Sequence, residues 1–211
     1  MQNKRNWLIA IAVIALFVVG YNIYYTPNVH GWFMMSKTRR TEDPSRTNHI
    51  GAPFSRSGKK VLVVYFTWGG NTREVAQHIH DVIGGDVYEI RTVNEYPSDY
   101  DSCTKVAKKE LEENARPELI GRNIRVDEYD TVFIGYPIWW YAAPRAVLSF
   151  VERYSFAGKE VVPFCTSGGD DLSETLDELK GLKAMQGAEF KDGLTANVWD
   201  DIDPWLVKLG Y

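Results

Sequence analysis

The stretch of sequence that decides the fold is KKVLVVYFTWGGNT, residues 59–72. Its first half is a short run of β-branched and aromatic residues, which is typical of a strand buried on both faces. Two glycines follow between Thr67 and Thr72, and apolar residues then recur at helical spacing as far as Ile83. We therefore expect a strand, a tight glycine loop and a helix over residues 59–83.

The same alternation of strand and helix patterns continues to the end of the chain. We expect further strands at 86–93, 131–136, 160–165 and 188–194, and helices at 100–114, 144–154, 172–185 and 200–209. This α/β alternation predicts a parallel sheet covered by helices on both faces. Ligands of such folds bind beyond the carboxyl ends of the strands. The loops after the first, third and fourth strands are therefore the candidate site.

The loop after the first strand has the chemistry of a phosphate site. Its N–H groups, two hydroxyls and the positive end of the following helix can all face one anion. It contains no Lys and lacks the GxGxxG spacing, so it fits neither a nucleoside triphosphate nor a dinucleotide well. We expect it to hold the phosphate of a monophosphate cofactor. For this loop alone, a glycine turn that caps a helix remains the alternative.

The other two loops add a flat surface and more hydrogen-bonding groups. The sequence YPIWWYAAP, residues 136–144, follows the third strand, and TSGGDD, residues 166–171, follows the fourth. Aromatic rings offer flat faces to a flat heterocycle, although we expect one of the tryptophans to pack inward. Either loop alone could be an ordinary turn, but three such loops at one edge of a sheet favour a ligand site.

By these motifs, residues 59–211 resemble the flavodoxin family, particularly compact members with a Tyr-Pro-Ile-Trp-Trp loop. The resemblance implies a flavodoxin-like, doubly wound five-stranded parallel sheet of order 2-1-3-4-5, with FMN as cofactor. It assigns the FMN phosphate to Thr67, Trp68, Gly69, Gly70, Asn71 and Thr72. It assigns the isoalloxazine ring to Pro137, Ile138, Trp139 and Trp140, and the other edge of that ring to Thr166, Ser167, Gly168 and Gly169.

The sequence departs from the family pattern in two places. Family members commonly carry a Gly beside the flavin N5, whereas no Gly lies between Tyr136 and Pro144, so the resemblance does not extend to the redox tuning that this Gly provides. The third loop contains Asp170 and Asp171. Near the flavin these charges would lower its reduction potential, and at the start of the next helix they would only cap it. We favour capping.

The N-terminal segment, residues 1–25, is predicted to be an uncleaved membrane anchor. Residues 6–36 contain no Asp, Glu, Lys or Arg, and the stretch from Trp7 to Tyr25 is long enough to cross a hydrocarbon core of about 30 Å. A cleaved signal peptide and a soluble hydrophobic helix are the alternatives, but no Ala-x-Ala cleavage pattern follows the apolar run. Residues 26–58 are rich in Pro, Ser, Thr, Gly and Arg and are predicted to be a flexible basic linker.

The distribution of charge bears on partners and on location. Residues 1–58 carry a net charge of +5 and residues 59–211 a net charge of −9. An acidic domain argues against nucleic acid as a partner and favours a cationic partner surface. Lys4 and Arg5 favour an extracytoplasmic domain on a single-pass anchor, whereas the basic residues at 37–40 favour the opposite orientation.

The cysteines and histidines show no metal-ligand spacing, so no metal site is expected. Cys165 ends an apolar run and is predicted to be a buried thiol. Together these features predict a membrane-tethered FMN electron-transfer protein whose partner is a redox protein or a quinone, with no catalytic side chain. The alternative is an FMN-dependent NAD(P)H or quinone reductase. A third interpretation, a non-redox module that has lost its flavin, is opposed by the intact first loop.

Overall fold

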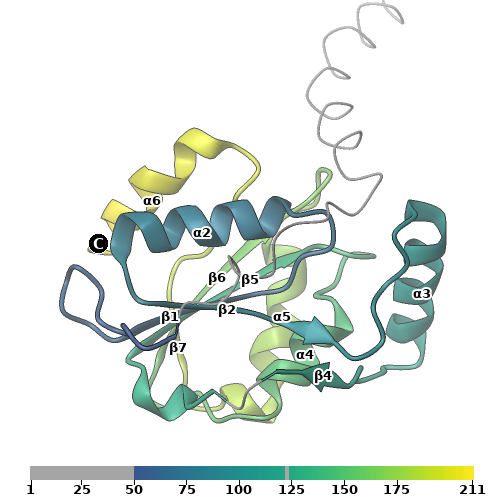
Figure 1. Ribbon diagram of the computed structural model, residues 1–211, viewed down its shortest axis with the longest axis horizontal. Helices are drawn as coiled ribbons and strands as arrows, with labels where there is room; N and C mark the ends of the chain where they lie inside the picture. Colours follow the sequence, from purple (N-terminus) through teal and green to yellow (C-terminus); the bar gives the residue numbers. More distant parts are fainter. Residues whose placement is uncertain (1–49, 122–123) are drawn as a thin grey trace, which may run out of the picture. The chain divides into compact units, whose positions relative to one another are not determined.

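The computed structural model of the chain describes residues 50–121 and 124–211 (Figure 1). The chain divides into two units, residues 1–35 and 36–211, and all the described residues belong to the second. The predicted membrane anchor, residues 1–25, and residues 26–49 of the predicted linker lie outside the described part. Within that part, no helix is both long and apolar enough to cross a membrane.

The remainder of the predicted linker, residues 50–58, is hydrogen-bonded to the domain. The backbone N–H groups of Gly51 and Ala52 donate to Asp86 Oδ1 at 2.9 and 2.8 Å. Further along, the Arg56 N–H donates to the carbonyl of Ile83 at 2.7 Å. These contacts join the segment to the end of the first helix and to the start of the second strand.

The main sheet has the strand order β2-β1-β5-β6-β7, and β8 also pairs with β6. All of these pairs are parallel. The strands are β1 (Val61–Tyr65), β2 (Asp86–Glu89), β5 (Thr131–Pro137), β6 (Glu160–Thr166), β7 (Glu189–Phe190) and β8 (Leu194–Thr195). The order corresponds to the predicted 2-1-3-4-5, with the fifth strand divided between β7 and β8.

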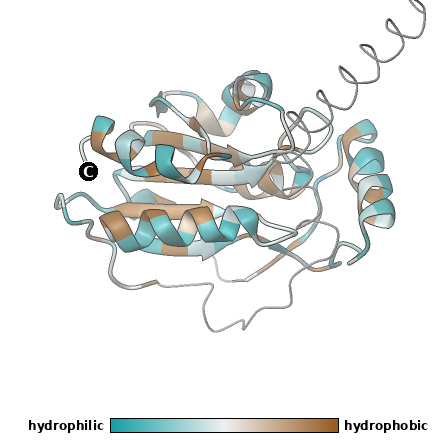
Figure 2. Ribbon diagram, turned by 90° about the horizontal axis from the view of Figure 1, so that it is seen from above, coloured by the Kyte–Doolittle hydropathy of each residue, from teal (hydrophilic) through white to brown (hydrophobic). Residues whose placement is uncertain are grey.

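Helices cover both faces of this sheet (Figures 1 and 2). One face packs against α2 (Asn71–Ile83) and α6 (Ile202–Lys208), and the other against α3 (Tyr100–Glu112), α4 (Arg145–Val151) and α5 (Ser173–Gly181). Residues of β1 alternate between the two layers: Val61, Val63 and Tyr65 face α2, while Leu62 and Val64 face the opposite core. This alternation explains why the strand is apolar at every position.

The predicted fifth strand, residues 188–194, is interrupted because of a proline in its neighbour. β7 pairs with β6 up to Val161, and β8 resumes pairing at Phe164. Between these points lies Pro163, which has no N–H to donate to a ladder. The outer strand also carries an extra residue there, which makes the break a bulge. Gly193 fits against β6 only because it has no side chain, since a Cβ would lie 2.6 Å from the Pro163 carbonyl oxygen.

The predicted second strand, residues 86–93, is likewise divided. Ile90 N–H donates to the Tyr65 carbonyl at 2.7 Å, and the chain then leaves the main sheet. β3 (Arg91–Thr92) pairs instead with β4 (Leu119–Ile120) in a separate antiparallel ladder. The sequence analysis did not predict this small sheet, because its two strands have only two residues each and lie far apart in the chain.

The predicted helices occur at the expected places but several have different ends. α4 is shorter than the predicted 144–154, and α5 ends at Gly181. The remaining turns are 3-10 segments: η2 (Val126–Glu128), η3 (Lys183–Met185) and η4 (Trp199–Asp201). The last of these leads directly into α6, whose first turn contains Pro204, as predicted.

Candidate functional site

Three loops meet at the carboxyl edge of the sheet because their strands are neighbours. We call them the glycine loop (residues 67–72, after β1), the aromatic loop (137–144, after β5) and the hydroxyl loop (166–171, after β6). Thr166 joins all three. Its hydroxyl lies 2.8 Å from the Thr72 hydroxyl, and its carbonyl accepts the Ile138 N–H at 2.9 Å. The structure therefore brings together the loops that the sequence nominated separately.

The glycine loop leads directly into α2. The N-cap residue Gly70 has φ 98°, a left-handed conformation in which side chains are disfavoured, and no side chain caps the helix. The first N–H groups of a helix have no partner within the helix, and its N-terminus carries a partial positive charge. The start of α2 is therefore available to hold an anion.

The threonines of this site retain hydroxyl protons that could be donated to phosphate oxygens. Thr67 Oγ1 accepts the Gly70 N–H at 3.0 Å, which leaves the Thr67 proton available. In the buried Thr72–Thr166 pair, one hydroxyl donates and the other keeps its own proton. The residues present therefore fit the terminal phosphate of a cofactor: backbone N–H groups and hydroxyls converge at one helix end.

A cation beside the glycine loop is already neutralised. Arg73, in the first turn of α2, donates to both carboxylate oxygens of Glu89 at 3.2 and 3.1 Å. Tyr65 donates to the same carboxylate at 3.0 Å. Burial and, second, the Glu89 charge raise the pKa of Tyr65, so its hydroxyl remains a donor. The sequence analysis missed this buried cluster, whose three members come from β1, β2 and α2.

The two tryptophans of the aromatic loop have different surroundings. Trp139 is half-buried and makes edge contacts with Phe66 and Tyr96, at ring-centroid distances of 5.4 and 5.1 Å. It is the tryptophan that packs inward, as expected for one of the two. Trp140 points to α3, where its Nε1–H donates to the Thr104 carbonyl at 3.1 Å. Ile138 is buried and Pro137 half-buried where the loop leaves β5.

The tip of the aromatic loop is a two-residue turn. Trp139 and Ala142 exchange backbone hydrogen bonds of 3.0 and 3.1 Å, and between them Trp140 and Tyr141 have φ values of 52° and 59°. This left-handed pair is the backbone of a type I′ turn, which usually requires Asn or Gly. The turn presents Trp140 and Tyr141 to solvent.

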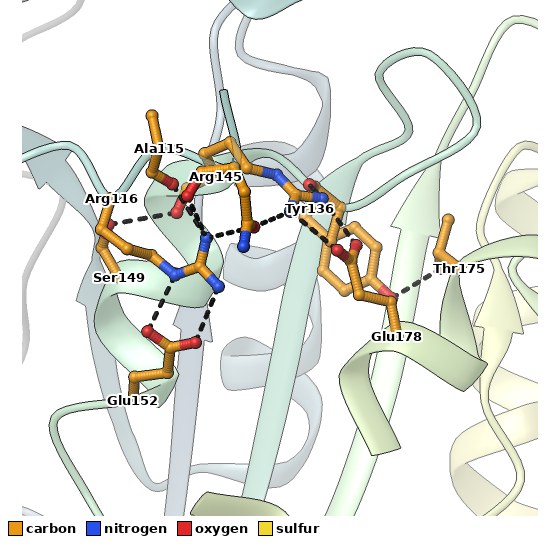
Figure 3. Close-up of polar contacts among 10 residues, drawn as sticks. Ala115, Arg116, Tyr136, Arg145, Ser149, Glu152, Thr175 and Glu178 are labelled. Carbon is orange, nitrogen blue, oxygen red and sulfur yellow. Dashed lines mark hydrogen bonds and ion pairs between the residues drawn. The ribbon is translucent and has the colours of Figure 1, made fainter. Parts of the chain in front are cut away.

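A buried arginine supports the aromatic loop from behind (Figure 3). Arg145, only 3% exposed, begins α4 and donates to both carboxylate oxygens of Glu178 on α5, at 2.7 and 2.6 Å. It also donates to Asn114 Oδ1 at 3.2 Å and to the carbonyl of Ala143 in the loop at 3.4 Å. Arg116 contacts the same Asn114 and forms a two-point ion pair with Glu152.

The hydroxyl loop is held by a residue that the sequence analysis did not identify. Asn197 accepts the Ser167 N–H at 2.9 Å and donates to Ser167 Oγ at 3.0 Å. Nothing in the local sequence around Ser167 indicates this partner, which lies after β8. Gly168 and Gly169 at the tip are exposed, and Gly169 has φ 155°.

Asp171 binds the start of α5. Its Oδ1 accepts from the Ser173 N–H at 2.9 Å and from the Ser173 hydroxyl at 2.6 Å, and its Oδ2 accepts from Thr195 at 2.9 Å. These bonds, the Ser173 hydroxyl first, hold the pKa of Asp171 below its usual range. The contacts agree with the capping role favoured for this pair of aspartates. Cys165, at the end of β6, is buried, and burial raises the pKa of its thiol to about 12.

The fold and the site define a doubly wound α/β domain with a phosphate-type loop and an aromatic loop at the topological switch point of its sheet. The model of the flavodoxin family matches residues 60–209, and the chain belongs to this family. No curated protein matches the chain.

Several solved structures are similar. A presumed flavoprotein from Bacteroides eggerthii is 34% identical, with a TM-score of 0.64, over 72% of this chain and 99% of its own. One from Bacteroides uniformis is 32% identical, with a TM-score of 0.61, over 71% and 98%. A flavoprotein from Lactobacillus acidophilus, solved in complex with FMN, is 21% identical, with a TM-score of 0.58, over 70% and 99%. The last similarity shows the fold alone.

Proposed function

We propose that this protein is an FMN-binding electron carrier attached to a membrane through its N-terminal segment. FMN is the cofactor supported by membership of the flavodoxin family and by the FMN complex of a protein with the same fold. The observation that carries the proposal is the uncapped start of α2, next to hydroxyls with protons to donate. The assignment of individual residues to parts of FMN stays a prediction.

In a carrier the flavin supplies the redox chemistry, and the protein binds it, orients it and sets its surroundings. The glycine loop would hold the phosphate through N–H groups and hydroxyls. The aromatic and hydroxyl loops would flank the ring, with Trp139 fixed by its contacts to Phe66 and Tyr96. No side chain need act as an acid, base or nucleophile, which favours a carrier over an enzyme.

The first experiment is the visible absorbance of the fragment Gly51–Tyr211, which corresponds to the described domain, before and after addition of FMN. We expect flavin bands that stay with the protein through gel filtration. A folded fragment that never retains FMN would contradict the proposal and would support the non-redox alternative.

The second candidate function is an FMN-dependent NAD(P)H or quinone reductase. The exposed aromatic turn at Trp140 and Tyr141 favours it, because such rings can stack on a flat substrate. Steady NAD(P)H oxidation by the purified protein alone would support the reductase. A flavin that turns over only with an added reductase would support the carrier.

The membrane attachment and the extracytoplasmic location of the domain are proposals that rest on residues 1–25. We expect the full-length chain to stay with membranes through an alkaline carbonate wash, and the Gly51–Tyr211 fragment to remain in solution. Protease added outside intact cells should cleave the domain from its anchor. Full-length protein that is released by the wash would argue against the anchor, and complete protection from protease would reverse the orientation.

A further inference from the structure

The turn at the tip of the aromatic loop contains two bulky residues in a conformation that disfavours them. Trp140 and Tyr141 both have left-handed backbone angles, with φ values of 52° and 59°. In this region the Cβ atom approaches the following carbonyl oxygen, so residues other than Gly and Asn adopt it at a cost. An outlier of this kind needs either a compensating contact or a functional reason.

The two residues differ in compensation. Trp140 donates its Nε1–H to the Thr104 carbonyl, and the Lys108 ammonium lies 5.2 Å from its ring centroid. Tyr141 is 66% exposed. Its side chain makes no hydrogen bond, ion pair or ring contact with any residue in 50–121 or 124–211. Within the described chain, Tyr141 therefore carries the conformational cost and receives nothing in return.

The position of Tyr141 suggests what its ring is for. The turn projects from the loop that joins β5 to α4, beside the Thr166 junction where the three loops of the site meet. An exposed aromatic face there can stack on a flat ring. The domain around it has a net charge of −9 over residues 59–211, which disfavours an anionic ligand. A flat, uncharged ring system satisfies both conditions.

We propose that Tyr141 is a specificity residue whose ring receives a flat, neutral quinone as electron acceptor at the rim of the FMN site. The inference rests on the proposed function and deepens it, since it names the class of acceptor. In the step concerned, the quinone gains two electrons and two protons and becomes the hydroquinone. The reduced cofactor supplies both electrons and both protons, and it returns to the oxidised state.

The test uses the full-length, FMN-loaded protein reduced with dithionite and mixed rapidly with an acceptor. Menadione is the flat neutral probe, and ferricyanide, which is anionic and not flat, is the control. In Tyr141→Gly the rate with subsaturating menadione should fall about three- to tenfold, the range expected for loss of one aromatic stack. The rate with ferricyanide should stay within about twofold. The matched variant Tyr141→Phe keeps the ring and should behave like the unaltered protein with both acceptors.

A purely structural role predicts a different thermal signature. Because glycine adopts left-handed angles freely, Tyr141→Gly should raise the melting temperature by about 2–4 °C while it slows the menadione reaction. A lower melting temperature together with equal losses for both acceptors would show a structural role and overturn the proposal.

Two further outcomes separate this inference from the proposed function. An unchanged menadione rate in a Tyr141→Gly protein that still holds FMN would overturn the inference alone. A full-length protein that retains no FMN would overturn the proposed function and the inference with it.

Discussion

The glycine loop and the aromatic loop lie at the same edge of the sheet but owe their shapes to different interactions. The glycine loop is formed by its own residues: a left-handed Gly70, a Thr67 hydroxyl that accepts the Gly70 N–H, and an uncapped helix start. The aromatic loop has an unfavourable turn at its tip and is held by residues from α3, α4, α5 and β1. Local chemistry therefore determines the first loop, and tertiary contacts determine the second.

The largest expected effect concerns the support of the aromatic loop. Arg145→Met removes a buried cation and leaves the Glu178 carboxylate and the Asn114 amide without it. We expect a loss of about 2–3 kcal/mol in the free energy of unfolding, near the lower limit for a broken buried ion pair because Glu178 is partly exposed. Urea unfolding at constant m-value measures it.

The control for this variant is Arg116→Met. Arg116 also forms a two-point pair with a glutamate, but both partners are solvent-accessible. Its loss should therefore cost at most about 1 kcal/mol. Equal losses in the two variants would mean that the arginine behind the aromatic loop is no more important than a surface ion pair.

The second prediction concerns the glycine loop. Thr67→Ala combined with Thr72→Ala removes two hydroxyls that we expect to bind the FMN phosphate. Each such hydrogen bond contributes about 1 kcal/mol or more, so the affinity for FMN should fall more than tenfold. Titration with flavin fluorescence measures the dissociation constant. Riboflavin, which lacks the phosphate, is the control ligand, and its affinity should change little. Unchanged FMN affinity would contradict the phosphate assignment.

The third prediction compares backbone conformation in the two loops. Gly70→Ala places a side chain at φ 98°, where it is disfavoured, and should lower the free energy of unfolding by about 1 kcal/mol. Tyr141→Gly makes the reverse change at the tip of the aromatic loop and should raise it. Urea unfolding of the two variants side by side tests the contrast. A change of the same sign in both would show that backbone strain does not distinguish the two loops.

The parts of the molecule that sequence predicted well are those governed by local chemistry. Strand β1, the glycine loop and α2 follow from one continuous stretch of residues. The apolar run at 160–165 predicted β6, but it did not show that Pro163 would divide the neighbouring strand, because that effect depends on the pairing of two distant segments. The pairing of β3 with β4 was missed for the same reason.

The candidate site shows the same division. Sequence placed Thr72 and Thr166 in loops at one edge of the sheet, and the structure joins their hydroxyls. It could not tell which tryptophan packs inward, because Phe66 and Tyr96, which select Trp139, come from other elements. Asn197 was not predicted at all, since an isolated Asn after a short strand carries no signal of its distant partner Ser167.

The smallest expected effect is a pH dependence confined to the aromatic loop. The glycine loop contains no titratable side chain. Behind the aromatic loop, however, Glu110 accepts the Tyr96 hydroxyl at 2.7 Å, and the Tyr96 ring contacts Trp139. Burial raises the pKa of Glu110, an effect that the Tyr96 hydrogen bond and the Arg145 charge offset only in part. The neutral carboxyl is therefore favoured more in the folded state than in the unfolded state.

The sign of the effect follows from this shift. The contribution of Glu110 to stability is complete below its ordinary pKa of 4.5 and is lost as pH rises through the higher pKa of the folded state. In flavin-free protein, the free energy of unfolding should therefore decline relative to Glu110→Gln as pH increases from 4.5. Because Trp139 packs against Tyr96, its fluorescence should change over the same interval. Parallel stability curves for the two proteins would show that Glu110 does not couple pH to the aromatic loop, and the loop would then depend on packing and on Arg145 alone.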